Sequence, residues 1–399
     1  MKRYLLIISL IVLALCLTVS CATKVTTEPV AAAEEVKALN SAVKDIQKYG
    51  NLVLSITKSD MDSIGAEYGD VFTVDLGDQV LAAPYCTSYS DVDLGNLVLR
   101  NDGDVMILAI NMGDFASSYG IATKVSNPDK TYQWVFEEGK KLEDITLSLI
   151  LTGKGEYRDQ YLIHQLSRTN EREDYSSDAV FANFREIVGG NLGSGALYRS
   201  SSPVNNEIGR AKYADELVSL NNIKSVMNLA DRRETIEGYF KEEDFASPYY
   251  KSLYENGQVI ALNMGVSFKT REFQTGLFEG LTFLSKNEGP YLVHCNEGKD
   301  RAGFTSALLS ALMGLTYDEI ASDYMTSYEN YYHVEKGTEQ YEAVKRSNID
   351  SMLSFIAGVE TKDLENVDLS GKAEEFLIAI GMEKADIDTL KSKLSKNYK

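Results

Sequence analysis

Cys295 and Arg301 are two residues of complementary chemistry, and five residues separate them. A cysteine is a nucleophile in its thiolate form, which positive charge and a helix N-terminus stabilise. An arginine guanidinium can hold two oxygens of a phosphate group through parallel hydrogen bonds. The pair therefore predicts nucleophilic attack by Cys295 on a phosphate group that Arg301 binds.

The elements around this pair must place the thiol at the start of a helix. Apolar residues 291–293 predict a short strand that ends at His294, and Gly298 lies where the following loop must bend. Apolar residues then recur at helical spacing and predict a helix from Arg301: Phe304, Ala307, Leu308, Ala311, Leu312 and Leu315. Such a strand–loop–helix unit points backbone N–H groups at an anion, so we expect those of residues 296–301 to line the site.

The full loop, residues 294–301, reads His-Cys-Asn-Glu-Gly-Lys-Asp-Arg. It resembles the phosphate-binding loop of the protein tyrosine phosphatase superfamily, and in particular of bacterial tyrosine/lipid, dual-specificity-like phosphatases. Four further segments resemble that family, namely residues 196–200, 226–234, 323–328 and 373–394. The resemblance covers about residues 180–399 and implies an α/β fold in which helices flank a central sheet.

The resemblance also implies catalytic roles. Cys295 would attack phosphorus and form a phosphocysteine, and Arg301 would bind the phosphate and stabilise the transition state. Asp300 would be the general acid that protonates the leaving oxygen. Asp231 and Asp244 are the alternatives for this role, because related phosphatases carry the acid on a separate loop.

The rest of the loop is expected to bind the substrate through Asn296, Glu297, Gly298, Lys299, Ala302 and Gly303. Lys299 would suit a multiply phosphorylated substrate, or it is simply a solvated lysine. Glu297 has no assigned role, since a carboxylate in such a loop is unfavourable unless it points outward or pairs with a cation. His294 is expected to order the loop through hydrogen bonds.

Ala302 departs from the family pattern, which has Ser or Thr after the loop arginine. That hydroxyl helps the thiolate to leave in the second chemical step, so its absence predicts slow hydrolysis of the phosphoenzyme. Thr305, one helical turn further on, is a possible substitute. A pseudo-phosphatase that only binds its ligand is the corresponding alternative.

The N-terminus predicts export. Lys2 and Arg3 precede an apolar run and then Cys21, a pattern that resembles a bacterial lipoprotein signal over residues 1–21. Lipidation of Cys21 would anchor the protein to the bacterial cell membrane; an ordinary signal peptide or a retained anchor are the alternatives. Beyond the signal only Cys86 and Cys295 remain, so a disulfide framework is not expected.

Three regions follow the signal. Residues 22–48 predict a tether with one short amphipathic helix, on the spacing of Val36, Leu39, Val43 and Ile46. Residues 49–155 carry short β-type runs between Gly and Asp turns and predict a small β-barrel, with a helix from Ser59 to Tyr68. Residues 176–399 form the predicted catalytic domain, and the stretch before them is transitional.

A second resemblance concerns the barrel region. Three segments resemble the C-terminal β-domain of SAM-hydroxide adenosyltransferases: Tyr49-Gly50-Asn51-Leu52, residues 89–95 and residues 109–113. In that family the domain contributes to a nucleoside site. The partner N-terminal domain is not visible in this sequence, so the resemblance implies a spacer or a nucleoside-binding module rather than that enzymatic activity.

Charge and composition narrow the partners. The formal net charge of -19 argues against nucleic acid, so a local positive site must attract an anionic substrate. The three histidines lie far apart and no metal-ligand cluster or cofactor motif is seen, so no metal and no cofactor is expected. The hypotheses are an exported tyrosine or dual-specificity phosphatase, a phosphoinositide or inositol-polyphosphate phosphatase, and a nucleoside- or phospho-ligand-binding pseudo-phosphatase.

Overall fold

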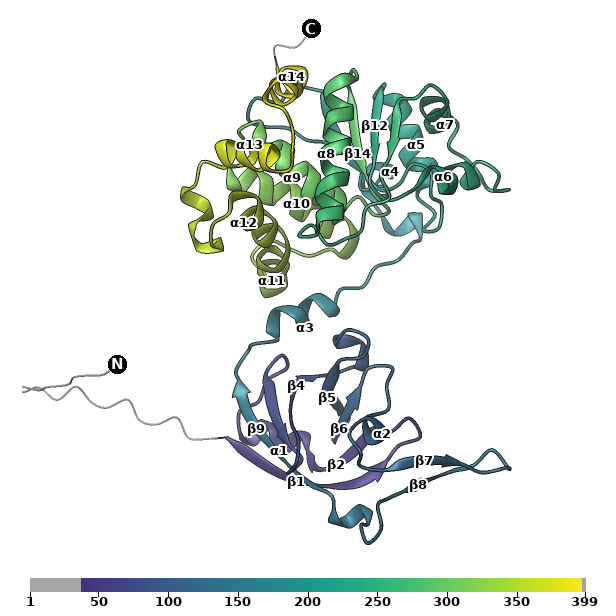
Figure 1. The fold of residues 1–399 in the computed structure, drawn as a ribbon, viewed down its shortest axis with the longest axis vertical. Coiled ribbons are helices and arrows are strands. Elements are labelled where there is room, and N and C mark those ends of the chain that lie inside the picture. The colour runs from purple at the N-terminus through teal and green to yellow at the C-terminus, as the bar shows by residue number, and fades with distance from the viewer. Residues whose placement is uncertain (1–36, 397–399) are drawn as a thin grey trace, which may run out of the picture. The chain divides into compact units, whose positions relative to one another are not determined.

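The computed structural model describes residues 37–396. These residues contain a closed seven-stranded barrel and, further along the chain, a five-stranded sheet with helices on both faces (Figure 1). The predicted α/β class with a small β-barrel is thus confirmed. The signal segment and Cys21 lie outside the described residues. Within the described part of the chain, no helix is long and apolar enough to cross a membrane.

The barrel is built from short strands with alternating burial. Around the barrel the strands follow the order β1-β2-β6-β5-β4-β3-β9, and only β4 and β5 pair in parallel. Along β2, Leu52, Leu54 and Ile56 face the core, as the two-residue period of a strand requires. The strands are β1 (Ala38–Ile46), β2 (Leu52–Thr57), β3 (Val71–Asp75), β4 (Val80–Cys86), β5 (Leu97–Asp102), β6 (Val105–Ile110) and β9 (Thr146–Gly153).

The predicted amphipathic helix near residue 40 is wrong, because strand β1 occupies Ala38–Ile46 and pairs with both β2 and β9. A β-bulge between Val43 and Asp45 explains the misleading spacing. A bulge adds one residue and reverses the alternation, so Val43 and Ile46 both face the core although three positions separate them. Residues 38–46 therefore belong to the barrel and not to a tether.

Smaller elements complete this part of the chain. Helix α1 (Lys58–Ser63) is shorter than predicted, and its N-cap is Thr57, not Ser59. Asp60 makes the reciprocal bond of a capping box, which fixes the helix start directly at the end of β2. The others are α2 (Phe115–Ser118), the hairpin strands β7 (Thr123–Ser126) and β8 (Tyr132–Val135), and α3 (Arg158–His164).

The second sheet has the order β10-β11-β14-β12-β13 and is parallel except for β10. All four residues of β14, at its centre, are buried, as expected for a strand covered on both faces. The predicted strands near residues 225, 259 and 291 are all present. The strands are β10 (Arg185–Glu186), β11 (Leu197–Ser200), β12 (Ser225–Asn228), β13 (Val259–Ala261) and β14 (Tyr291–His294).

Two cores cover the two faces of this sheet. Met227 and Val293 pack into the larger core with α8 (Arg271–Lys286) and α9 (Arg301–Leu312). Val226 and Leu292, their neighbours along the strands, face the opposite core with α5 (Ala211–Leu220) and α7 (Pro248–Glu255). Figure 1 shows α8 on one side of β12 and β14, with α5 and α7 on the other.

Helix α9 is buried on every side from Ala302 to Leu312, whereas the sequence predicted a single buried face. The sheet and the helices that follow it in the chain pack around it, which explains why the polar residues after Arg301 are small Ser and Thr. The remaining helices are α4 (Asp178–Phe181), α6 (Arg233–Tyr239), α10 (Tyr317–Tyr332), α11 (Glu339–Lys345), α12 (Ser351–Ala357), α13 (Leu369–Ala379) and α14 (Lys384–Leu394).

Candidate active site

The loop between β14 and α9 turns its backbone carbonyls outward. Four consecutive carbonyl oxygens accept hydrogen bonds from the surrounding protein. That of Asn296 accepts from Ser202 N–H (3.0 Å), and that of Glu297 from Asn183 Nδ2 (3.1 Å) and Tyr331 Oη (2.7 Å). Those of Gly298 and Lys299 both accept from Arg199 Nη2, at 2.8 and 3.1 Å. The C=O and the next N–H of a trans peptide point in opposite directions. The N–H groups of residues 297–300 therefore face inward, and none donates to another residue of the described chain. Successive inward N–H groups of this kind are donors that suit an anion.

Gly298 allows this loop to lie directly on the end of β11. Its φ is +69°, a left-handed conformation that side chains other than glycine disfavour. A Cβ at this position would lie 2.2 Å from the carbonyl oxygen of Ser200. The glycine is therefore required both by the turn and by the close approach of two backbones.

A buried ion-pair cluster braces the loop from outside. Arg199 is fully buried, and its Nη1 lies 2.7 Å from Asp323 Oδ2. Arg185 Nε binds the other carboxylate oxygen of Asp323, also at 2.7 Å. Arg199 thus pairs with an acidic neighbour and with the carbonyls on the outer side of the loop.

Cys295 and Arg301 lie at the two ends of this loop. Cys295 has an exposed fraction of 3% and a free thiol. Arg301 opens α9, and its Nη1 donates to the carbonyl oxygen of Met264 at 3.0 Å. This bond fixes one side of the guanidinium and leaves its other nitrogens available to an anion.

No hydroxyl follows Arg301. Ala302 is fully buried, and Gly303 beside it allows the ring of Tyr324 to pack against the helix. The hydroxyl of Thr305 donates to the carbonyl oxygen of Arg301 at 3.1 Å. Its proton is therefore used within the helix, so Thr305 does not replace the missing Ser or Thr.

His294 is buried, and its ring lies edge-on to Tyr250 with the centroids 5.7 Å apart. Burial lowers the pKa of His294 to about 3, so the imidazole is neutral near pH 7. A polar contact with the backbone of Cys295 partly opposes this shift, although neither ring nitrogen reaches full hydrogen-bond geometry in the described chain. His294 therefore packs against Tyr250 and touches the loop at Cys295, and its ordering of the loop stays a prediction.

Lys299 is not a solvated lysine. Its side chain is only 13% exposed, and Nζ lies 3.3 Å from Glu297 Oε2 and donates to Tyr332 Oη at 3.1 Å. The ammonium also lies 5.1 Å from the ring centroids of Tyr328 and Tyr332. Burial alone would lower the pKa of Lys299, but Tyr328, Asp300 and Glu297 together raise it well above its ordinary value.

Glu297 pairs with two cations and so resolves the difficulty of a carboxylate in this loop. Besides Lys299, it accepts a short ion-paired hydrogen bond from Arg168 Nη2. Burial alone would raise the pKa of Glu297, but Lys299 and Arg168 outweigh it and the net pKa is lowered. The carboxylate is therefore ionised and its charge is compensated.

The three possible general acids differ in position. Asp300 lies in the loop itself; its side chain is 46% exposed, but the protein atoms around the carboxyl desolvate it and raise its pKa, against the opposing effect of Lys299. Asp231 is buried, accepts from Asn228 Nδ2 at 3.0 Å, and has a pKa raised by burial. Asp244 is exposed and accepts from Asn206 Nδ2 at 2.7 Å. No described contact joins Asp244 to the loop.

Several contributors to the site were not found in the sequence. Three of them reach the loop or its supports from distant positions: Arg168, Asn183 and Arg185. Each is an ordinary polar residue in a segment without a motif. Only the Asp323–Tyr324 segment gave a signal, because it resembles the family.

A second pocket, of about 600 Å³, lies on the barrel. It brings together residues that the second resemblance rests on. Its lining is Tyr49, Asn51, Tyr89, Ile110, Asn111, Met112, Gly113, Asp114 and Lys124.

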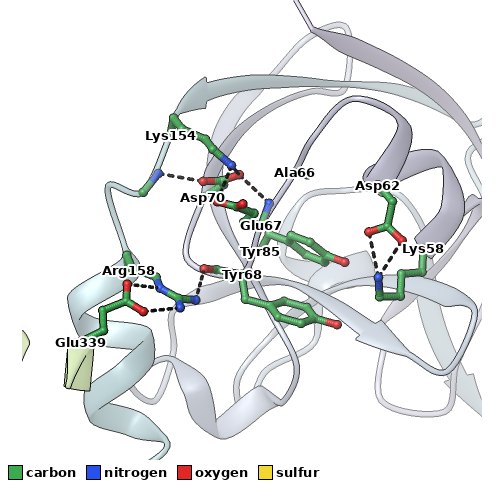
Figure 2. A pocket seen from close by; sticks show the side chains of 11 residues that line it. Lys58, Asp62, Ala66, Glu67, Tyr68, Asp70, Tyr85, Lys154, Arg158 and Glu339 are labelled. Carbon is green, nitrogen blue, oxygen red and sulfur yellow. Dashed lines mark hydrogen bonds and ion pairs between the residues drawn. The ribbon is translucent and has the colours of Figure 1, made fainter.

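A third pocket, of about 640 Å³, is lined by three cations and four carboxylates (Figure 2). Lys58 pairs with Asp62 at 2.7 Å, Lys154 with Asp70 at 3.0 Å, and Arg158 with Glu339 at 2.7 Å. Every cation that lines it is paired with a carboxylate, so the pocket has no excess positive charge for an anion.

Comparison with known families agrees with this geometry. A family model described as the tyrosine phosphatase family matches residues 180–396, more than half of the chain. The chain belongs to the tyrosine phosphatase family. This phosphatase also matches, over residues 42–126, the model for the SAM hydroxide adenosyltransferase C-terminal domain. Both resemblances seen in the sequence are thus confirmed.

Other comparisons add little about the phosphatase. A comparison with curated proteins finds no match. Among solved structures, one similar chain is a crystal structure of an uncharacterized conserved protein from Thermotoga maritima. The identity is 19% and the TM-score 0.23, and the match spans 29% of the phosphatase and 36% of that chain, about a third of its length.

Proposed function

We propose that this protein is an exported phosphatase of the tyrosine or dual-specificity type, which hydrolyses phosphomonoesters through a phosphocysteine. The observation that carries the proposal is the outward orientation of four loop carbonyls, which leaves inward N–H groups around Cys295 at the start of α9. A helix N-terminus and Arg301 add positive potential at the same point.

The chemistry follows from these positions. The Cys295 thiolate attacks phosphorus, a sulfur–phosphorus bond forms, and the ester oxygen leaves with the proton of Asp300. A water molecule then attacks the phosphocysteine and gives its proton to Asp300. Inorganic phosphate leaves and the thiolate is restored. The inward N–H groups and Arg301 stabilise the charge on the phosphoryl oxygens in both steps.

A phosphoinositide or inositol-polyphosphate substrate is the second candidate. The specific observation in its favour is Lys299, which aromatic rings and Glu297 hold in place beside the loop. A fixed ammonium next to the phosphate site suits a second phosphate group on the substrate.

The barrel pocket supports a third function, the binding of a nucleoside. Its lining combines tyrosine rings with amide and carboxylate side chains, which suit the base and the hydroxyl groups of such a ligand. Binding of adenosine to a Cys295→Ser variant would demonstrate this function independently of any phosphatase activity.

Export and lipid anchoring through Cys21 remain part of the proposal. Cys86 and Cys295 are both free and buried, so an oxidising compartment would not link them to each other without unfolding. Membrane fractionation of the wild type and of Cys21→Ala tests the anchor: the variant should be released, and its retention in the membrane would contradict lipidation.

Substrate profiling of the purified full-length protein tests the activity. We expect hydrolysis of p-nitrophenyl phosphate and of a phosphotyrosine peptide, and complete loss in Cys295→Ser. Phosphoinositides and inositol hexakisphosphate distinguish the second candidate. Full turnover in Cys295→Ser would refute the thiol mechanism.

A further inference from the structure

The segment before the phosphatase sheet contributes a charge to the site. Residues 165–177, here called the connecting segment, run from the end of α3 to the start of α4 and precede the part of the chain that the phosphatase family model matches. Arg168 in this segment pairs with Glu297 in the phosphate loop. Its guanidinium also lies over the ring of Tyr331, 4.8 Å from the centroid.

The contact belongs to an anchored structure. Arg210 is fully buried and donates from Nη2 to the carbonyl oxygen of Thr169 at 3.3 Å and to Tyr175 Oη at 3.0 Å. Tyr175 Oη in turn donates to the carbonyl of Thr169 at 2.7 Å. The carbonyl of the residue next to Arg168 therefore accepts two hydrogen bonds, which hold the arginine at the loop.

Charge explains why the site needs this arginine. Within the loop, the carboxylates of Glu297 and Asp300 balance the cations Lys299 and Arg301, so the loop side chains have no net positive charge when all are ionised. Arg168 supplies the additional cation. Its side chain is 16% exposed and its Nη1 is buried without a partner in the described chain, so solvent screens its charge weakly.

The ion pair between Arg168 and Glu297 also determines how much negative charge acts on Lys299. Glu297 lies between the two cations, with one oxygen on Arg168 and the other 3.3 Å from Lys299 Nζ. Without Arg168, the full charge of Glu297 would act on Lys299 and on the incoming phosphate. The effect would be weaker anion binding rather than a slower chemical step.

We propose that Arg168 is a positioning residue of the phosphatase, which neutralises Glu297 so that the loop and Lys299 can accept a dianionic phosphate. The inference rests on the proposed function, and it makes the connecting segment part of the substrate-binding apparatus.

A double-mutant cycle on the full-length protein tests this role, with tungstate affinity by calorimetry and with kcat and KM for p-nitrophenyl phosphate as readouts. Arg168→Met keeps the apolar stem and removes the charge. We expect it to weaken tungstate binding and raise KM by about tenfold with kcat nearly unchanged, while Arg168→Lys stays within about threefold of the wild type.

The decisive comparison uses Glu297→Gln. In this background Arg168→Met should change the tungstate affinity by less than about twofold, because no carboxylate remains to be neutralised. Arg346→Met is the control: the half-exposed Arg346 pairs with Asp159 and has no described contact with the loop or the connecting segment, so its loss should leave both readouts unchanged.

Equal losses from Arg168→Met with and without Glu297 would assign Arg168 a merely structural role and overturn the inference. Unchanged binding in Arg168→Met would overturn it as well. If the wild type and Cys295→Ser showed equal turnover, the proposed function would fail instead, while the tungstate cycle would still report on Arg168.

Discussion

Arg199 Nη2 donates to the carbonyl oxygen of Gly298 at 2.8 Å, from a side chain without any solvent exposure. The same nitrogen reaches the carbonyl of Lys299 at 3.1 Å. An arginine that lies outside the anion site therefore determines which way the peptide planes of the loop face. The inward N–H groups depend on this bond as much as on the loop sequence.

Removal of this support should damage both stability and activity. Arg199→Met leaves Asp323 with Arg185 alone and two buried carbonyls without a donor. We expect the free energy of unfolding to fall by about 3 kcal/mol, and kcat/KM by about a hundredfold. Chemical denaturation and steady-state kinetics measure the two effects. Arg346→Met, which breaks the solvent-exposed pair with Asp159, is the control and should cost less than about 1 kcal/mol.

Gly298→Ala should abolish oxyanion binding. The added Cβ meets the Ser200 carbonyl oxygen at 2.2 Å and also strains a backbone with φ of +69°. Gly257→Ala separates the two effects, because Gly257 has φ of +73° and nothing within 4 Å of its Cβ position. We expect Gly257→Ala to cost about 1 kcal/mol of stability with normal kinetics. Tungstate binding by Gly298→Ala at wild-type affinity would contradict the packing argument.

The pH profile should identify the general acid. Burial raises the pKa of Asp300, so the carboxyl stays protonated to higher pH than an ordinary aspartate and turnover falls only when pH rises through that value. Asp300→Asn should remove this alkaline limb and lower kcat for phosphotyrosine about a hundredfold. The effect should be smaller for p-nitrophenyl phosphate, whose leaving group needs little protonation. Loss of the limb in Asp231→Asn, with a normal profile in Asp300→Asn, would assign the role to Asp231.

Ala302→Ser should accelerate the second step. The wild type has no hydroxyl after Arg301, and Thr305 uses its proton within the helix. We expect a pre-steady-state burst of p-nitrophenol in the wild type, because the phosphocysteine accumulates. The serine variant should show about a tenfold higher steady-state rate, since a hydroxyl donor stabilises the departing thiolate. An absent burst with an unchanged rate in the variant would show that the first step is limiting.

His294 should make folding sensitive to acid. Its pKa is about 3 in the folded protein and about 6.5 in an unfolded chain, so the unfolded state binds more protons between these values. Stability from this group is complete above about pH 6.5 and declines as pH falls, by about 1.4 kcal/mol per unit. His294→Phe removes the titration, so its stability relative to the wild type should improve with this slope between pH 6 and 4. Parallel stability curves would exclude the effect.

Some features could be predicted from local sequence alone. The apolar run before Cys295, the glycine in the loop and the helical spacing after Arg301 all act within one segment, and the structure places β14 and α9 there. Most barrel strands were predicted for the same reason, because the alternation in β2 or β6 and the turns between them are local. Strand β1 was not, since its bulge imitates the spacing of a helix.

The sequence by itself determined the strand–loop–helix unit and the spacing of Cys295 and Arg301, the proposed nucleophile and the proposed phosphate-binding arginine. Their chemistry depends on residue type and short spacing, and both are visible in the chain. Only the tertiary structure decided how the loop is held and charged. Arg199 reaches it from β11, and Arg168 from the connecting segment, over chain separations that no local pattern records. Buried ion pairs and hydrogen bonds are made by whichever segments the packed helices and sheet bring together, so these partners appear only after folding.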